Sequence, residues 1–433
     1  MTNLAEIRRV LRHREFRFLW LAQSASVIGD NLVLVALALF VIQRTGSATD
    51  LGLVLAAKAL SLIGFLLIGG VWADRLPRHR VMITTDLIRF ALHGLLAVLI
   101  FAGKAPIWQL VAIEMAFGGA EAFFRPAAEG VLPQTVPERD IQPARAITSM
   151  SNNIAEFAGP AVATALVLGA GAGWAFALDA ATFLLSAGFL SRVRPRRRER
   201  AIGQDTGAQT SAGKGILAEI KAGSREVRAR TWVWATLLTF CAVLFFGLAP
   251  WFVLGPVIAR SQYGHVSVYG WLEAAVGLGT IAGSLVAVNW RPRFPMRTAM
   301  LTIMAWPVAA ILYGARAPLG VVMPFAVLAG SGIAVFDVLW TTALAERIPP
   351  ARLSRVSSYD WMVSGALLPL GYALAGPLAS ALGAVTVMLS GSVLALVVFA
   401  LGLLPRETRM LARVETPPAS VEAAGELAIT HRH

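Results

Sequence analysis

Twelve long apolar runs follow one another through this 433-residue chain, separated by short polar loops. An α-helix needs about 20 predominantly apolar residues to cross the hydrocarbon core of a bilayer. The runs lie at residues 16–42, 51–72, 81–101, 107–124, 144–168, 174–190, 232–259, 268–290, 298–313, 319–345, 357–382 and 385–404. Charged residues make up only 15% of the chain, against about a quarter of an ordinary soluble domain. The sequence therefore predicts an all-α membrane protein with twelve transmembrane helices.

Arginine is concentrated in every second loop of this pattern. The segments 73–80, 125–145, 291–297 and 346–356 each carry three arginines, and the interval 191–230 is also rich in arginine, whereas the other loops carry one Lys or Arg residue or none. Short loops rich in Lys and Arg stay in the cytoplasm, so both termini are expected there, in an inner (plasma) membrane. This placement accounts for the net charge of +13. We therefore expect a lipid bilayer and no nucleic acid as the partner of the basic residues.

The longest polar interval, 191–230, divides the chain into two bundles of six spans, 16–190 and 231–405. We expect this interval to be a cytoplasmic linker that ends in an amphipathic helix on the membrane surface. Residues 1–15 are expected to form a cytoplasmic segment, and 406–433 a disordered tail. The bundles resemble each other, because a glycine and a proline adjoin in both: Gly159-Pro160 and Gly376-Pro377. Glycine permits close helix contact and proline favours a kink.

The loop at 70–80 reads GVWADRLPRHR. It resembles the signature loop between the second and third helices of the major facilitator superfamily, in which a glycine precedes Asp-Arg and further basic residues. The matching positions are Gly70, Asp74, Arg75, Arg78 and Arg80. The resemblance implies that this loop acts as a gate on the cytoplasmic side. Asp74 could bond to the start of the eleventh helix, around residues 357–358; the alternative is a static anchor of the topology.

Further segments are similar to the twelve-helix drug/proton antiporter group, which includes macrolide-efflux and enterobactin-exporter proteins. They are SVIGD at 26–30, FFRPA at 123–127 and RVSS at 355–358. This resemblance implies the major facilitator fold: two pseudo-symmetric six-helix bundles with substrate bound between them. It also implies exchange of substrate for protons.

Asp30 is the first candidate for proton coupling. It lies 14 residues after Phe16, which is about 21 Å at the helical rise and well inside the bilayer. Asn31 adjoins it and no cation is near in sequence. An isolated carboxyl there should stay neutral until water or a cation reaches it, which suits a proton carrier or a binder of a cationic substrate. The alternative is a structural aspartate that hydrogen-bonds to neighbouring helices.

Other polar residues fall inside the apolar runs. Six residues are candidates to line a substrate cavity: Lys58, Glu114, Glu156, Glu273, Asp337 and Trp340. Lys58 and Glu114 could form a pair, and Trp340 could stack on a flat substrate. For the charged residues the alternative is a structural hydrogen bond, and for the tryptophan it is ordinary packing.

Two further pairs have helical spacing. Asp86 and Arg89 are three residues apart, and Glu121 and Arg125 are four apart, so each pair shares a helix face. We assign both pairs to gating and not to substrate binding.

No motif of an active site is present. No Gly-rich phosphate loop occurs, and no cysteine or histidine cluster has metal-ligand spacing. We therefore expect no enzymatic activity and no cofactor or metal. The leading prediction is a monomeric secondary transporter that exports a hydrophobic or amphipathic small molecule (drug, siderophore or secondary metabolite) in exchange for protons, by alternating access. The alternatives are an importer or lipid flippase of the same fold, and a non-transporting membrane sensor or scaffold.

Overall fold

The computed structural model describes residues 4–194, 225, 227–348, 356, 360 and 363–413. These residues are almost entirely helical and contain no β-strand. The N-terminal group of helices comprises α1 (Leu4–Leu11), α2 (Arg14–Thr45), α3 (Ala48–Arg75), α4 (Arg78–Phe101), α5 (Ile107–Val131), α6 (Ile141–Gly169) and α7 (Ala172–Leu190). The C-terminal group comprises α9 (Thr231–Val243), α10 (Ala249–Gln262), α11 (Ser267–Asn289), α12 (Pro295–Ile303), α13 (Ala305–Gly314), α14 (Leu319–Arg347), α16 (Leu368–Leu382), α17 (Ala384–Gly402) and α18 (Arg406–Arg409).

Within the described residues, eleven helical stretches are long and apolar enough to cross a membrane. The predicted fifth span, α6, is not among them, because arginine, serine and asparagine occupy its first half. It is nevertheless 29 residues long, roughly 40 Å at the helical rise, and so exceeds the thickness of the hydrocarbon core. The all-α membrane fold is thus confirmed.

Two predicted spans are interrupted. A π-helical turn, η3 (Leu244–Leu248), separates α9 from α10. Pro250, in the first turn of α10, has no backbone N–H to donate, and a wider turn before it accommodates the missing bond. The predicted ninth span is split at Met304 into α12 and α13.

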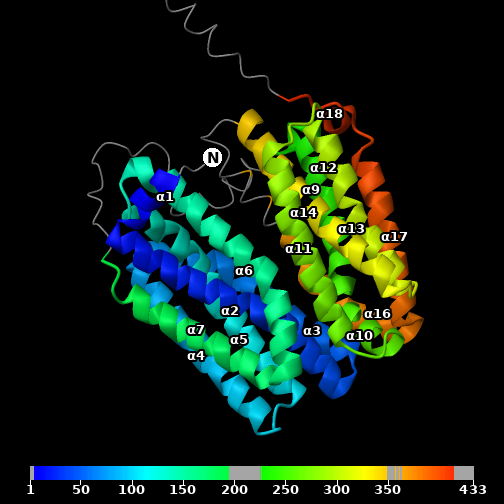
Figure 1. Cartoon of the computed structure of the whole chain (residues 1–433), viewed down its shortest axis with the longest axis horizontal. Coiled ribbons are helices and arrows are strands. Elements are labelled where there is room, and N and C mark those ends of the chain that lie inside the picture. The colour runs from blue at the N-terminus through cyan, green and yellow to red at the C-terminus, as the bar shows by residue number, and fades with distance from the viewer. Residues whose placement is uncertain are drawn as a thin grey trace, which may run out of the picture.

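The two groups of helices lie side by side and diverge toward the end that carries α1 and α18 (Figure 1). Two helix pairs make most of the contact between the groups: α3 with α16, and α6 with α11. The N-terminal group contributes its second and fifth predicted spans to these pairs, and the C-terminal group contributes its fifth and second. The contacts therefore follow the internal repeat expected from the sequence.

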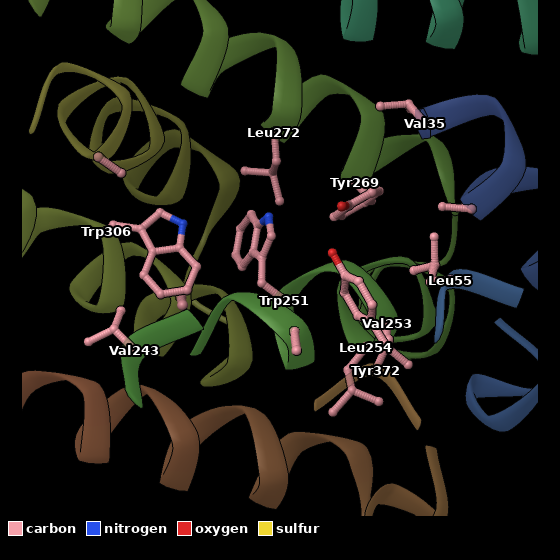
Figure 2. Packing of buried hydrophobic residues seen from close by; sticks show 14 of the residues in the cluster. Val35, Leu55, Val243, Trp251, Val253, Leu254, Tyr269, Leu272, Trp306 and Tyr372 are labelled. Atoms are coloured by element: carbon pink, nitrogen blue, oxygen red, sulfur yellow. The ribbon is translucent and has the colours of Figure 1, made fainter. Parts of the chain in front are cut away.

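At the opposite end, which we call the closed end, the groups meet through glycines. A Cβ added to Gly52 would lie 2.4 Å from the carbonyl oxygen of Tyr372, and one added to Gly376 would lie 2.3 Å from the Cα of Thr49. Such distances leave no room for a side chain, so the backbones themselves are in contact. Figure 2 shows Tyr372 and Tyr269 of the C-terminal group beside Leu55 and Val35 of the N-terminal group. Among the described residues, one hydrogen bond joins the groups here, from Arg260 to the carbonyl of Ile42 at 2.5 Å.

Both ends of the described chain are packed onto the helices. In α1, Val10 is fully buried, and Asp140 beside α6 accepts hydrogen bonds from Arg9 (3.0 Å) and His13 (2.9 Å). Part of the predicted N-terminal segment therefore forms a helix that is docked on the N-terminal group.

The prediction of a disordered tail from residue 406 was wrong for 406–413. There α18 packs against α9 and α12, with Thr408 and Leu411 buried. The rest of the predicted tail, and most of the predicted linker, lie outside the described residues.

Candidate functional site: a buried charge cluster

Charged side chains from five helices meet inside the N-terminal group. The charge cluster consists of Asp30, Lys58, Asp86, Arg89, His93, Glu114, Glu121, Arg125 and Asp179. These residues come from α2, α3, α4, α5 and α7. A charge within the hydrocarbon core costs several kcal/mol unless it is paired, and charges that persist there mark functional pathways.

Arg89 is the centre of one arm of the cluster. Its side chain is only 1% exposed, and its Nη2 donates to Asp86 Oδ1 at 2.5 Å. Its Nη1 lies 3.6 Å from Asp30 Oδ2. Ser186 of α7 donates to the other oxygen of Asp86 at 2.6 Å. Arg89 therefore ties α4 to α2, and Asp86 ties α4 to α7.

Aromatic rings surround the guanidinium of Arg89. Its Cζ lies 4.2 Å from the ring centroid of Phe124 and 4.4 Å from that of Phe183. A cation over an aromatic face is attracted by the ring quadrupole, more strongly where water is excluded. The rings therefore compensate part of the desolvation of this charge.

His93 lies one helical turn beyond Arg89, between two carboxyls. Its Nδ1 bonds to Asp179, and its Nε2 is 3.4 Å from Glu114 Oε1. Between two ionised carboxylates the ring is satisfied as the imidazolium, with a hydrogen on each nitrogen. The ring stacks on Phe117 with centroids 4.0 Å apart and planes 6° apart. These contacts hold the side chains of His93, Asp179, Glu114 and Phe117 in one arrangement.

Lys58 of α3 connects the contacts around His93 to those between Glu121 and Arg125. Its Nζ lies 3.9 Å from Glu114 and 4.0 Å from Glu121, and 4.5 Å from the ring centroid of Phe117. Arg125 donates to Glu121 at 2.6 and 3.0 Å. The cluster thus runs continuously from Lys58 toward the surface, where Arg125 is 51% exposed.

The cluster holds one more acid than it has cations. The acids are Asp30, Asp86, Glu114, Glu121 and Asp179, and the cations are Lys58, Arg89, Arg125 and His93 in its charged form. In a medium of low dielectric constant an uncompensated charge is costly, and one bound proton would make the cluster neutral. Asp30 has the most exposed side chain of the five acids, at 29%, against 12% for Glu121 and 0% for the others. Asp30 is therefore the acid that water reaches most easily.

The pairs expected from helical spacing form as expected. Asp86 contacts Arg89 and Glu121 contacts Arg125. Lys58 and Glu114, expected to pair across helices, lie within ion-pair distance. No cation is near Asp30 in the sequence, but α4 brings Arg89 against α2, so Asp30 is not the isolated carboxyl that was expected.

The sequence analysis placed neither His93 nor Asp179 in this cluster. The one available signal was spacing, since His93 follows Arg89 by four residues and so shares its helix face. Asp179 is 86 residues away in sequence and reaches His93 only through the packing of α4 on α7.

Asn31 has a local role beside the cluster. Its side-chain amide donates to the carbonyl of Val27 at 2.8 Å. A Cβ added to Gly159 would lie 2.6 Å from the Cβ of Asn31, so α2 and α6 cross closely at this point. Pro160 follows, and α6 continues through it, as α16 continues through Pro377. Gly159 and Gly376 thus each make a close contact with a neighbouring helix. The kinks expected at the two Gly-Pro pairs stay a prediction.

Two candidate residues of the C-terminal group, Trp340 and Glu273, make contacts within their own group of helices. Trp340 is only 5% exposed, donates to Asp360 at 2.9 Å and contacts Trp232 edge to face, with ring centroids 5.6 Å apart. The prediction that it lines a cavity was wrong, because its ring is enclosed by its own group. Glu273 is half-buried and accepts a hydrogen bond from Trp251 at 2.6 Å.

Glu156 of α6 and Asp337 of α14 are exposed. They belong to different groups, and their charges interact. They are thus two exposed acids, one from each group.

The signature loop is described in part. α3 ends at Arg75, a turn follows at residues 76–77, and α4 begins at Arg78. The guanidinium of Arg78 lies against Gly130 of α5, and Arg80 is exposed. The side chains of Gly70, Asp74 and Arg75, and residues 357–358, lie outside the described parts of the chain. Within the described parts, no group of His, Cys, Asp or Glu side chains could hold a metal ion.

Membrane-crossing helices in two packed groups, with a charge cluster enclosed in one of them, define a multi-pass membrane transporter of the major facilitator class. The chain belongs to the transmembrane secretion effector family of that superfamily, whose sequence profile matches residues 8–423.

Two relatives are efflux proteins. The chain is 23% identical over 382 residues to macrolide efflux protein A of Streptococcus pyogenes, covering 85% of this chain and 90% of the relative. It is 27% identical over 367 residues to the multidrug efflux pump Tap of Mycolicibacterium fortuitum, covering 82% and 87%.

Solved structures share the fold. A bacterial homologue of the lysosomal transporter Spinster, inward-facing and unoccupied, superposes with a TM-score of 0.68 at 19% identity, covering 94% of this chain and 99% of that one. The nucleoside transporter NupG superposes with a TM-score of 0.66 at 13% identity, covering 90% and 98%.

Proposed function

We propose that this transporter exports a hydrophobic or amphipathic small molecule from the cytoplasm in exchange for protons. The names of the two efflux relatives support the direction of transport. The alternation of arginine-rich loops supports an inner membrane with both termini in the cytoplasm. With that orientation the closed end faces outward, and the end at which the groups diverge faces the cytoplasm.

The observation that carries proton coupling is the excess of one acid in the charge cluster, together with the exposure of Asp30. A proton on Asp30 makes the cluster neutral and removes the ion pair between Asp30 and Arg89, so that Arg89 is paired with Asp86. Loss of that proton restores the attraction between Asp30 and Arg89, and so between α2 and α4. Protonation thereby changes how firmly α2, which also carries Ile42 at the closed end, is held.

Substrate enters this proposal between the two groups of helices. Glu156 and Asp337 would line its path from opposite sides, because both are exposed and their charges interact. The protein would act as a monomer, since the N-terminal group alone supplies every residue of the charge cluster.

The test is uptake into everted membrane vesicles, in which export from the cell appears as accumulation. A panel of fluorescent drugs and siderophores is offered with an imposed proton gradient, with and without a protonophore. The wild type should accumulate at least one compound, and the protonophore should abolish the accumulation. Asp30→Asn should equilibrate that compound without concentrating it. Glu129→Gln is the matched control, because this carboxyl is 75% exposed and lies outside the cluster.

Each result decides one part of the proposal. Gradient-driven accumulation by Asp30→Asn at the wild-type level would remove Asp30 as the proton carrier. Accumulation that the protonophore leaves unchanged would exclude proton coupling. Expulsion from the everted vesicles would show import instead of export.

A further inference from the structure

α12, α17 and α18 come together at one end of the C-terminal group (Figure 1). A groove lies between them. It has a volume of about 630 Å³, within the range of roughly 300–1,000 Å³ found for small-molecule sites. Seven residues line it: Arg297, Leu301, Ala400, Leu403, Leu404, Arg409 and Met410. No acidic side chain is among them. We refer to this feature as the α18 groove.

Two arginines from distant parts of the chain supply its charge. Arg297 lies in the first turn of α12 and Arg409 at the end of α18. Both side chains are exposed, and neither has an acidic partner among the described residues. Unpaired cations that converge on one hollow attract an anion.

Large apolar side chains form the rest of the wall. Leu301 is 49% exposed, Leu404 66% and Met410 55%. They lie at the ends of two membrane-crossing stretches, since Leu301 is in the second turn of α12 and Leu404 follows the end of α17. Positive charge at the boundary and apolar surface toward the bilayer form the pattern that suits an amphipathic anion better than a free phosphate.

A second groove beside α18 is lined by Arg230, Arg347 and Arg406, together with Glu407. Arg347 already donates to the carbonyl of Ala412. Unlike the α18 groove, this one carries a carboxylate beside its arginines, which would repel an anion.

We propose that the α18 groove binds the headgroup of an anionic phospholipid, with its phosphate between Arg297 and Arg409. The acyl chains would lie on Leu301 and Leu404. The arginine distribution of the sequence puts this end of the C-terminal group at the cytoplasmic leaflet, where anionic lipids attract basic residues. The site is independent of what the protein transports.

The fold of the chain end supports a built site. α18 is fixed in place, because Thr408 and Leu411 are buried and the backbone N–H of Arg413 donates to the carbonyl of Arg293 at 3.1 Å. Arg293 lies four residues before Arg297, so this bond holds α18 beside the start of α12. A lipid in the groove would bridge the same two segments.

Native mass spectrometry of the purified full-length protein tests the proposal. The detergent-solubilised protein is titrated with phosphatidylglycerol, and separately with phosphatidylcholine as the neutral lipid and glycerol phosphate as the soluble anion. We expect an adduct with phosphatidylglycerol alone. Arg297→Gln and Arg409→Gln should each weaken it roughly fivefold and the double variant about 25-fold, as expected for one and two basic residues near an anionic surface.

Arg406→Gln is the matched control, because it removes an exposed arginine of the same short helix that faces the other groove. It should bind phosphatidylglycerol like the wild type. Three results would each overturn the proposal: no adduct on the wild type, an undiminished adduct on the double variant, or an equal loss in Arg406→Gln. Adducts of glycerol phosphate as strong as those of phosphatidylglycerol would identify a soluble-anion site instead. Size-exclusion chromatography shows that each variant is folded.

Discussion

Replacing Arg89 with methionine should destabilise the protein more than most single substitutions can. The side chain is 1% exposed and contacts Asp86, whose side chain is fully buried. Methionine keeps the apolar contacts with Phe124 and Phe183 and removes the charge. Asp86 then keeps only the hydrogen bond from Ser186. Removing one partner of a buried ion pair typically costs about 3–5 kcal/mol, because the other charge stays buried and uncompensated.

A second substitution should recover most of this loss. In Arg89→Met/Asp86→Leu both buried charges are gone, and exchanging a buried pair for apolar residues of similar volume is often neutral. Ser186 loses its acceptor, which costs about 1–3 kcal/mol if no carbonyl replaces it. Asp30 also loses a partner, but its side chain is 29% exposed and water can reach it. The double variant should therefore be more stable than Arg89→Met alone.

Unfolding by sodium dodecyl sulfate in mixed micelles, followed by circular dichroism, measures these differences. Every 1.4 kcal/mol is a factor of ten in the unfolding equilibrium, so the expected loss is roughly 10²–10⁴-fold. Arg145→Gln is the control, because its ion pair with Glu129 is exposed on both sides and should leave the midpoint unchanged. Arg89→Met with a wild-type midpoint would refute the reasoning, as would a double variant that is less stable than the single one.

Two further predictions concern the closed end and the N-terminus. Gly376→Val should lower the free energy of unfolding by about 1–3 kcal/mol, because its Cβ would meet the backbone of Thr49. It should also speed maleimide labelling of Val35→Cys in a Cys241→Ala background. Gly64→Val is the control and should have neither effect, because nothing lies within 4 Å of its Cβ. At Asp140 the hydrogen bond from His13 and the charge of Arg9 hold the pKa of the carboxyl below its ordinary value. The ionised carboxyl therefore stabilises the docking of α1 fully at a pH above the ordinary pKa, and this contribution is lost as the pH falls through the lowered pKa. The anisotropy of a dye on Leu4→Cys, also without Cys241, should therefore fall on acidification of the wild type, and Asp140→Asn should show the low value at every pH.

The helices and the short-range pairs could be predicted because both follow from spacing along one chain. Apolar runs of the required length place the spans, and separations of three or four residues place Asp86 beside Arg89 and Glu121 beside Arg125. No comparable rule joins Asp30 to Arg89, or His93 to Asp179. Those contacts depend on the rotation of α2, α4 and α7 about their axes, which the sequence does not state directly.

Trp340 and residues 406–413 also differ from what the sequence predicted. From the sequence alone, Trp340 could face either a substrate or the neighbouring helices, because an aromatic residue inside an apolar run suits both surroundings. The polar composition of the tail suggested disorder from residue 406, yet a few buried positions, among them Thr408 and Leu411, are enough to fix α18. In the tail, burial of single side chains thus outweighed average composition.

The glycine contacts at the closed end have a mechanical consequence. Among the described residues, the surfaces that meet there are bare backbone, aliphatic and aromatic groups, and one hydrogen bond, and no ion pair crosses between them. Separating these surfaces would leave no charge buried without a partner, so the two groups can part there at little electrostatic cost. In the proposed cycle, the changes of charge would be confined to the N-terminal group, and the contact between the groups would stay uncharged.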